Sequence, residues 1–204
     1  MSPFTLEHSR WAYRADFALY GGAVVLFATF LLVAGPPGMR LEIWALALLG
    51  LVGWSALEYA LHRFVLHGLP PFKRWHAQHH RRPQALMGAP TWLSLSLFGL
   101  GAALPAWSLL PLQAALPLLL GLLLGYTAYI STHHWLHHAG GPKFEWQRRR
   151  LRWHARHHER AGSRRQTGHY GVTTALWDRL LGTGGRASRR ALLWQDEATD
   201  PEAR

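Results

Sequence analysis

Long uncharged stretches constrain the fold of this chain more than any other feature of its sequence. Residues 17–35, 92–110 and 112–130 each contain 19 residues without a charged side chain, and a fourth apolar stretch runs from 43 to 57 and continues to 61. A 19-residue helix is about 28 Å long, close to the thickness of the hydrocarbon core of a bilayer. We therefore predict an all-α integral membrane protein with transmembrane helices at about 17–35, 41–61, 92–110 and 112–130. Pro111 separates the last two, which we expect to form a helical hairpin.

The distribution of basic residues predicts the orientation. If the N-terminus is cytoplasmic, all but Arg40 of the 22 Lys and Arg lie in cytoplasmic segments, as the positive-inside rule requires. We expect both termini in the cytoplasm, in a bacterial cytoplasmic membrane. The expected organisation is a cytoplasmic N-terminus (1–16), one membrane-embedded domain (17–183) and a loose, mixed-charge tail (184–204).

Composition excludes several other classes of protein. Without cysteine the chain forms no disulfide framework, zinc ribbon or iron–sulfur cluster. The net charge of +11 suggests a nucleic-acid binder, but the basic residues follow the predicted topology and no nucleic-acid motif is present. We therefore expect no nucleic-acid partner. A soluble bundle of four buried helices is the structural alternative.

Histidine is concentrated in four clusters. Of the 14 histidines, 13 lie between residues 62 and 169, and none lies inside a predicted transmembrane helix except near a cytoplasmic end. The clusters are HRFVLH (62–67), HAQHH (76–80), HHWLHH (133–138) and HARHH (154–158). On a helix, residues three or four apart share a face, so each cluster with that spacing can direct imidazoles at one place.

The helical period divides these histidines further. The two adjacent histidines that end each HxxHH block are about 100° apart, and we expect them to bind different metal ions. His62 and His67 are about 140° out of alignment in an ideal helix, which requires a helix end, a local distortion or two targets. So many imidazoles are more than one metal ion can bind, and we therefore expect two ions. No Glu-x-x-His motif is present, so we expect the ligands to be all nitrogen, or nearly so. Ligand type alone does not identify the metal, because imidazole suits iron, zinc, copper and nickel.

Together the clusters resemble a known family. The segments EYALHRFVLH, RWHAQHH, THHWLHH, WHARHH and GHYGVTTALWDRLLGT, between residues 58 and 183, are similar to the fatty acid hydroxylase and sterol desaturase superfamily, with closest similarity to its sphingolipid fatty acid 2-hydroxylase branch. The resemblance implies four transmembrane helices and a cytoplasmic helical cap that holds a di-metal centre. The metal ligands carried over by motif are His62, His67, His76, His79, His80, His133, His137, His154, His157 and His158. Aligning Thr-His-x-x-x-His selects His133 and His137 over His134 and His138.

The resemblance also implies the activity. We expect an oxidoreductase that uses two iron ions, O2 and two electrons to hydroxylate a C–H bond of a lipid that enters from the bilayer, most simply on a fatty acyl chain; purified protein could instead carry zinc. The chain has no room for the fused cytochrome b5 domain of some relatives, so electrons are expected from a separate donor protein. A sterol or carotenoid hydroxylase or desaturase and a non-catalytic zinc-stabilised membrane protein remain alternatives.

Two acids and several arginines are expected to assist the ligands. Glu58 and Asp178 are predicted to lie behind the metal ligands and accept imidazole N–H groups, because such acceptors orient metal-binding histidines. The Arg-rich surroundings (Arg81, Arg82, Arg152, Arg156) are expected to disfavour protonated histidine and so help metal binding.

Overall fold

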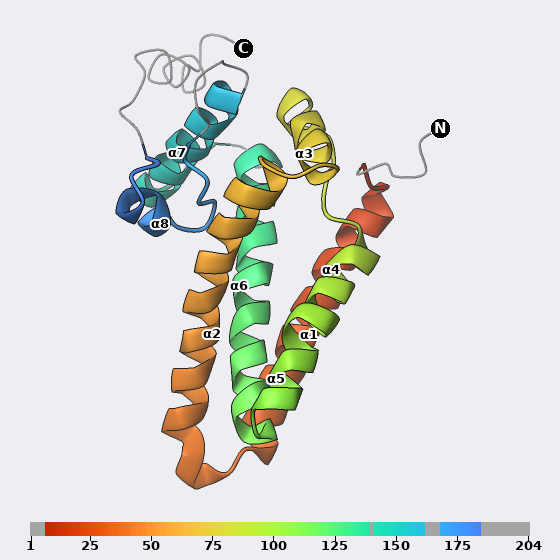
Figure 1. Ribbon diagram of the computed structural model, residues 1–204, viewed down its shortest axis with the longest axis vertical. Helices are drawn as coiled ribbons and strands as arrows, with labels where there is room; N and C mark the ends of the chain where they lie inside the picture. The colour runs from red at the N-terminus through yellow and green to blue at the C-terminus, as the bar shows by residue number, and fades with distance from the viewer. Residues whose placement is uncertain (1–6, 139–140, 162–167, 185–204) are drawn as a thin grey trace. The chain divides into compact units, whose positions relative to one another are not determined.

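The computed structural model describes residues 7–138, 141–161 and 168–184, and within these residues the fold is helical without a strand (Figure 1). The elements, in chain order, are α1 (Arg10–Ala34), η1 (Pro37–Met39), α2 (Arg40–Ala60), η2 (Leu61–Leu66), α3 (Phe72–Arg81), α4 (Thr91–Phe98), η3 (Gly99–Ala103), α5 (Leu104–Leu109), α6 (Leu112–His138), α7 (Glu145–Ala161) and α8 (Leu176–Leu180). The predicted tail, except for Gly184, lies outside the described residues.

Four helical segments are long and apolar enough to cross a membrane: Arg10–Ala34, Pro37–Leu66, Thr91–Leu109 and Leu112–His138. The predicted all-α membrane fold is thus confirmed, with three helical segments longer than predicted, the second of them running from Pro37 to Leu66. The first helix begins at Arg10 because the Ser9 side chain caps it, accepting the Ala12 N–H at 3.2 Å. The last continues past Ile130 to His138, so its final two turns carry the third histidine cluster on helical backbone.

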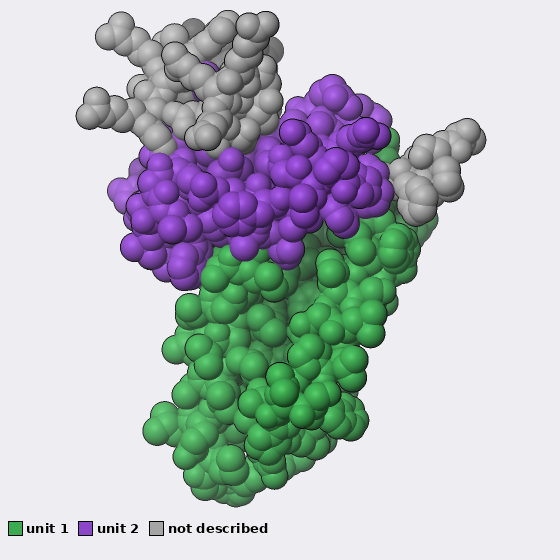
Figure 2. Space-filling model, in the orientation of Figure 1, with its two compact units in different colours: residues 1–57, 85–131 green, residues 58–84, 132–204 purple. Residues whose placement is uncertain are grey.

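The chain divides into two compact units, residues 1–57 with 85–131 and residues 58–84 with 132–204 (Figure 2). The first unit exposes apolar side chains on its helices, including Val33, Leu41 and Trp107, each with 78% or more of its surface accessible. Exposed apolar surface on this scale suits lipid and not water. This observation argues against the soluble alternative and supports a multi-pass membrane protein.

Small residues bring α2 and α6 together inside the first unit. A Cβ added to Gly50 would lie 2.2 Å from the Leu118 carbonyl oxygen, and one added to Gly121 would lie 1.9 Å from the Ala47 carbonyl oxygen. Glycine at such positions lets two helix backbones approach closely, which is the main source of packing between helices in lipid.

A π-helical turn interrupts the third segment just before Pro105. Residues 99–103 form η3, and the Leu104 N–H bonds to the Gly99 carbonyl five residues earlier. Proline provides no N–H and its ring crowds the preceding turn, so a wider turn there accommodates it. The helix therefore continues through α5 to Leu109 and meets α6 after a short turn, as the predicted hairpin requires.

Candidate metal centre

The ten predicted ligands all belong to the second unit and come from four helical segments. His62 lies in η2 and His67 directly follows it; α3 carries the second cluster, the end of α6 the third and α7 the fourth. Because both HxxHH blocks are helical, as predicted, each can direct histidines to more than one place.

The π-helical turn η2 resolves the five-residue spacing between His62 and His67. The His67 N–H donates to the His62 carbonyl at 3.2 Å, a bond across five residues that an α-helix does not make. The wider turn brings the two rings onto one side, with centroids 5.2 Å apart. The local distortion that the sequence left as one of three possibilities is therefore the one observed.

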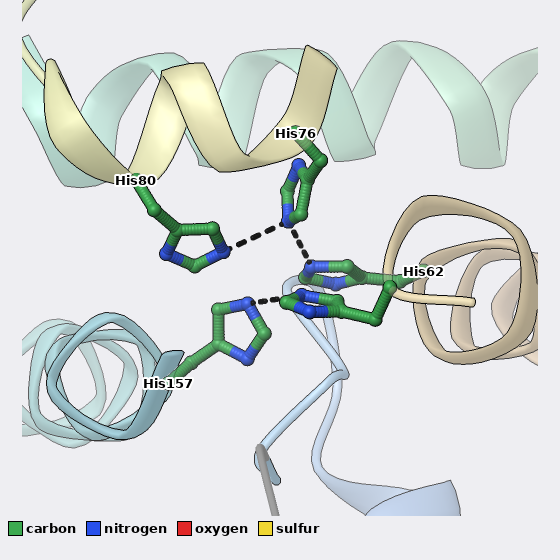
Figure 3. Close-up of side chains that lie close together, drawn as sticks. His62, His76, His80 and His157 are labelled. Carbon is green, nitrogen blue, oxygen red and sulfur yellow. Dashed lines mark hydrogen bonds between the residues drawn. The ribbon is translucent and has the colours of Figure 1, made fainter. Parts of the chain in front are cut away.

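Five imidazoles form the first histidine group: His62, His67, His76, His80 and His157. One ligand atom from each lies within 4.8 Å of every other. Within the group, Nε2 atoms are 2.9 Å apart for His62 and His76, 3.0 Å for His76 and His80, and 3.1 Å for His67 and His157. Figure 3 shows the labelled rings of this group turned toward a common centre.

Four further imidazoles form the second histidine group: His79, His137, His154 and His158. The Nε2 atoms of His137 and His154 are 2.8 Å apart, and those of His154 and His158 are 3.1 Å apart. The ring of His133 lies beside this group, 4.8 Å from His79 and 4.7 Å from His137 between centroids, although its nitrogens are not among the four.

The adjacent histidines of each block separate as the helical period predicts. His80 and His157 belong to the first group, and their neighbours His79 and His158 belong to the second. Each of α3 and α7 therefore contributes to both groups, and assignment to two different metal ions stays a prediction.

The geometry of both groups fits a metal ion. Two nitrogens at right angles around an ion, each about 2.0–2.1 Å from it, are about 2.8–3.0 Å apart, close to the observed 2.8–3.1 Å. Among the described residues, neither ring nitrogen of His79 has a hydrogen-bond partner. Buried polar atoms are rarely left without a partner, and a bound cation would satisfy lone pairs that converge in this way.

Burial keeps these imidazoles neutral, which ligation requires. Burial lowers the pKa of His67 to about 4, with a contribution from Lys73, and it lowers the pKa of His79 to about 4 and that of His80 to about 3, with contributions from neighbouring histidines. Burial is also the largest cause that holds the pKa of His157 well below its usual value. The sequence attributed this effect to arginines; the structure attributes it mainly to desolvation.

A loop before α8 orients two histidines of the first group. His62 Nδ1 donates to the Tyr170 carbonyl at 2.5 Å, and His157 Nδ1 donates to the Gly168 carbonyl at 2.8 Å. With the proton held on Nδ1, the Nε2 lone pair faces the other imidazoles, as metal-binding histidines require. We call residues 168–173 the carbonyl loop. Sequence analysis missed its role because a backbone acceptor has no sequence signature.

Glu58 is buried and binds the carbonyl loop. It accepts the N–H groups of Val172 and Thr173 at 2.7 and 3.0 Å and the Thr173 hydroxyl at 2.5 Å. The sequence expected this carboxylate to receive an imidazole N–H directly, whereas the structure shows it holding the loop whose carbonyl receives the N–H of His62.

Asp178 binds the same loop from α8. It accepts the N–H groups of Tyr170 and Gly171 at 2.9 and 2.7 Å, the Thr183 hydroxyl at 2.6 Å and the Trp153 indole N–H at 3.3 Å. Two buried carboxylates therefore fix the backbone of residues 170–173, which includes the Tyr170 carbonyl that binds His62.

Three further histidines lie outside both groups: His134, His138 and His169. The rings of His134 and His138 stack on each other with centroids 4.8 Å apart. His169 is fully buried with a positive φ of 60°, and its ring lies 4.4 Å from that of Trp153. His137 belongs to the second group and His133 lies beside it; their selection as metal ligands over His134 and His138 stays a prediction.

Comparisons with known proteins agree with this geometry. A family model described as fatty acid hydroxylase matches residues 47–183. The dihydroceramide fatty acyl 2-hydroxylase FAH2 of Arabidopsis thaliana is 35% identical over 157 residues, covering 70% of this chain and 61% of that protein. The fatty acid 2-hydroxylase of Homo sapiens is 31% identical over 185 residues, covering 82% and 46%.

A solved structure is also similar. It is full-length scs7p, in which only the hydroxylase domain is visible, and it matches with a TM-score of 0.70 and 26% identity over 87% of this chain and 67% of that one. The chain spans about half to three fifths of the length of the plant and human relatives.

Proposed function

The chain belongs to the fatty acid hydroxylase family, and we propose that it is a membrane-bound di-iron oxidoreductase that uses O2 and two electrons to hydroxylate a fatty acyl chain. The observation that carries this proposal is the convergence of nine imidazole ligand atoms in two compact groups. Because the relatives are named as 2-hydroxylases, we assign the hydroxylation to the carbon next to the acyl carbonyl.

The ten histidines predicted from the sequence would hold the two ions. The first group would bind one ion, and the second group together with His133 would bind the other. Bound iron would supply the activation of O2, which no amino-acid side chain provides. The chain's own contribution is to keep the imidazoles neutral by burial and to orient His62 and His157 through the carbonyl loop.

The substrate and the electrons come from outside the chain. Apolar helices that suit lipid are consistent with an acyl chain entering from the bilayer. Two electrons would come from a separate donor protein. From the positive-inside rule we propose that the second unit and both termini are cytoplasmic, at a bacterial cytoplasmic membrane, where a separate donor has access.

Expression in a host of known lipid composition tests the function. Wild-type cells should accumulate 2-hydroxylated acyl chains, detected by mass spectrometry, and the purified protein should contain about two irons per chain. The double variant His157→Ala, His158→Ala, which removes one ligand from each group, should lose both product and metal. The double variant His134→Ala, His138→Ala is the matched control, because it removes two histidines outside the groups.

Three outcomes would change the assignment. Absence of metal from the wild-type protein would refute the di-metal centre. Two zinc ions without a hydroxylated product would favour a zinc-stabilised membrane protein. An oxidised sterol or carotenoid in place of a hydroxylated acyl chain would keep the chemistry and change the substrate.

A further inference from the structure

The two histidine groups differ in what holds their imidazoles. In the first group, two of five histidines donate their Nδ1–H to backbone carbonyls, at 2.5 Å for His62 and 2.8 Å for His157. In the second group, His79 has no hydrogen-bond partner at either ring nitrogen among the described residues, and His154 has none at Nδ1; in the first group His80 Nδ1 is the only buried ring nitrogen likewise without one.

The Tyr170 carbonyl that binds His62 is itself held in place. Glu58 and Asp178, 3% and 0% exposed, accept four consecutive backbone N–H groups, those of residues 170–173. A Cβ added to Gly171 would lie 1.9 Å from the Thr174 carbonyl oxygen and 3.1 Å from the Asp178 carboxylate. Gly171 therefore lies in a turn too tight for a side chain, and the four N–H bonds fix residues 170–173. The imidazole of His62, bonded to the Tyr170 carbonyl, is thus preorganised before any ion binds.

Preorganisation raises metal affinity, because the ordering of the ligands is completed on folding and not on binding. Hydrogen bonds from ligand imidazoles to fixed acceptors have the same effect, and their loss typically lowers metal affinity about 10–100-fold. We infer that the two metal sites are unequal, with the first histidine group binding its ion more tightly and earlier than the second, and that Glu58 is a positioning residue for the first site alone.

This inference rests on the proposed metal function and is tested by metal binding without turnover. Metal-free protein in mild detergent is titrated with Co2+, followed by calorimetry and by the visible absorbance of the bound ion. The expected result is two steps, with dissociation constants at least about 10-fold apart. His157→Ala should remove the tighter step and His154→Ala the weaker one, which assigns each step to its group.

Glu58→Gln should weaken the tighter step about 10–100-fold and leave the weaker step unchanged. Thr173→Val, which removes only the hydroxyl bond to Glu58, should weaken the same step by a smaller factor and keeps the test valid if Glu58→Gln does not fold. Glu145→Gln is the matched control. This acid is exposed on α7, pairs with arginines on that helix and should leave both steps unchanged.

The outcomes distinguish the inference of two unequal metal sites from the proposed di-metal function on which it rests. Two steps of equal affinity, or a Glu58→Gln variant that weakens both steps alike, would overturn the inference and leave the di-metal proposal intact. Absence of any Co2+ binding by the wild-type protein would refute the proposed function itself.

Discussion

Substitution of Gly50 by alanine tests whether close packing of α2 on α6 stabilises the membrane unit. The new Cβ would lie 2.2 Å from the Leu118 carbonyl oxygen, where real Cβ contacts are 3.0 Å or longer. The helices must therefore separate by about 0.8 Å, the difference between these two distances. The obstructing atom belongs to the backbone of α6, so a side-chain rotation does not relieve the clash.

Gly53 provides a matched control on the same helix. A Cβ added there meets nothing within 4 Å. Both substitutions gain about 1 kcal/mol of helix propensity, so the difference between the two variants isolates the packing effect. Overpacking typically costs about 1–3 kcal/mol, and about 1 kcal/mol corresponds to about 2–4 °C in unfolding midpoint for a chain of this size.

We therefore expect Gly50→Ala to unfold about 2–12 °C below Gly53→Ala. Gly53→Ala should itself unfold about 2–4 °C above wild type. The assay is thermal unfolding in detergent, followed by tryptophan fluorescence. Equal midpoints for the two variants would refute the close approach of α2 and α6, because a loosely packed interface would accept either methyl group.

Three further predictions concern the metal centre. Gly171→Ala should displace the carbonyl loop, because its Cβ would lie 1.9 Å from the Thr174 carbonyl oxygen. The variant should therefore bind less metal, measured by elemental analysis. Full metal content would contradict a rigid loop. Metal-free protein should lose stability as pH falls from about 7.5 to 5. The folded-state pKa values of His67 and His79 are about 4, below the ordinary value near 6.5, so the unfolded chain binds more protons in this range; a constant unfolding midpoint across it would refute buried neutral imidazoles. Removing metal with a chelator should lower the unfolding midpoint, because an ion present at 100 times its dissociation constant stabilises the folded state by about 2.7 kcal/mol. Identical midpoints with and without chelator would argue against a metal that binds the folded state.

Local patterns in the sequence predicted the apolar helices and the separation of adjacent histidines into two groups. Uncharged stretches of membrane length predicted the four apolar helices, and the 100° step between adjacent residues predicted the separation of His79 from His80 and of His157 from His158. Both signals depend on neighbours along the chain, so the sequence alone contains them.

Tertiary structure decided how the site is held. The π-helical turn that aligns His62 with His67 was one of three possibilities in the sequence, because a helix period does not reveal where it is broken. The carbonyl loop, and the attachment of Glu58 to it across 114 and 115 positions of sequence, were absent from the prediction. Every residue carries a backbone carbonyl, so only the folded chain determines which carbonyls meet an imidazole.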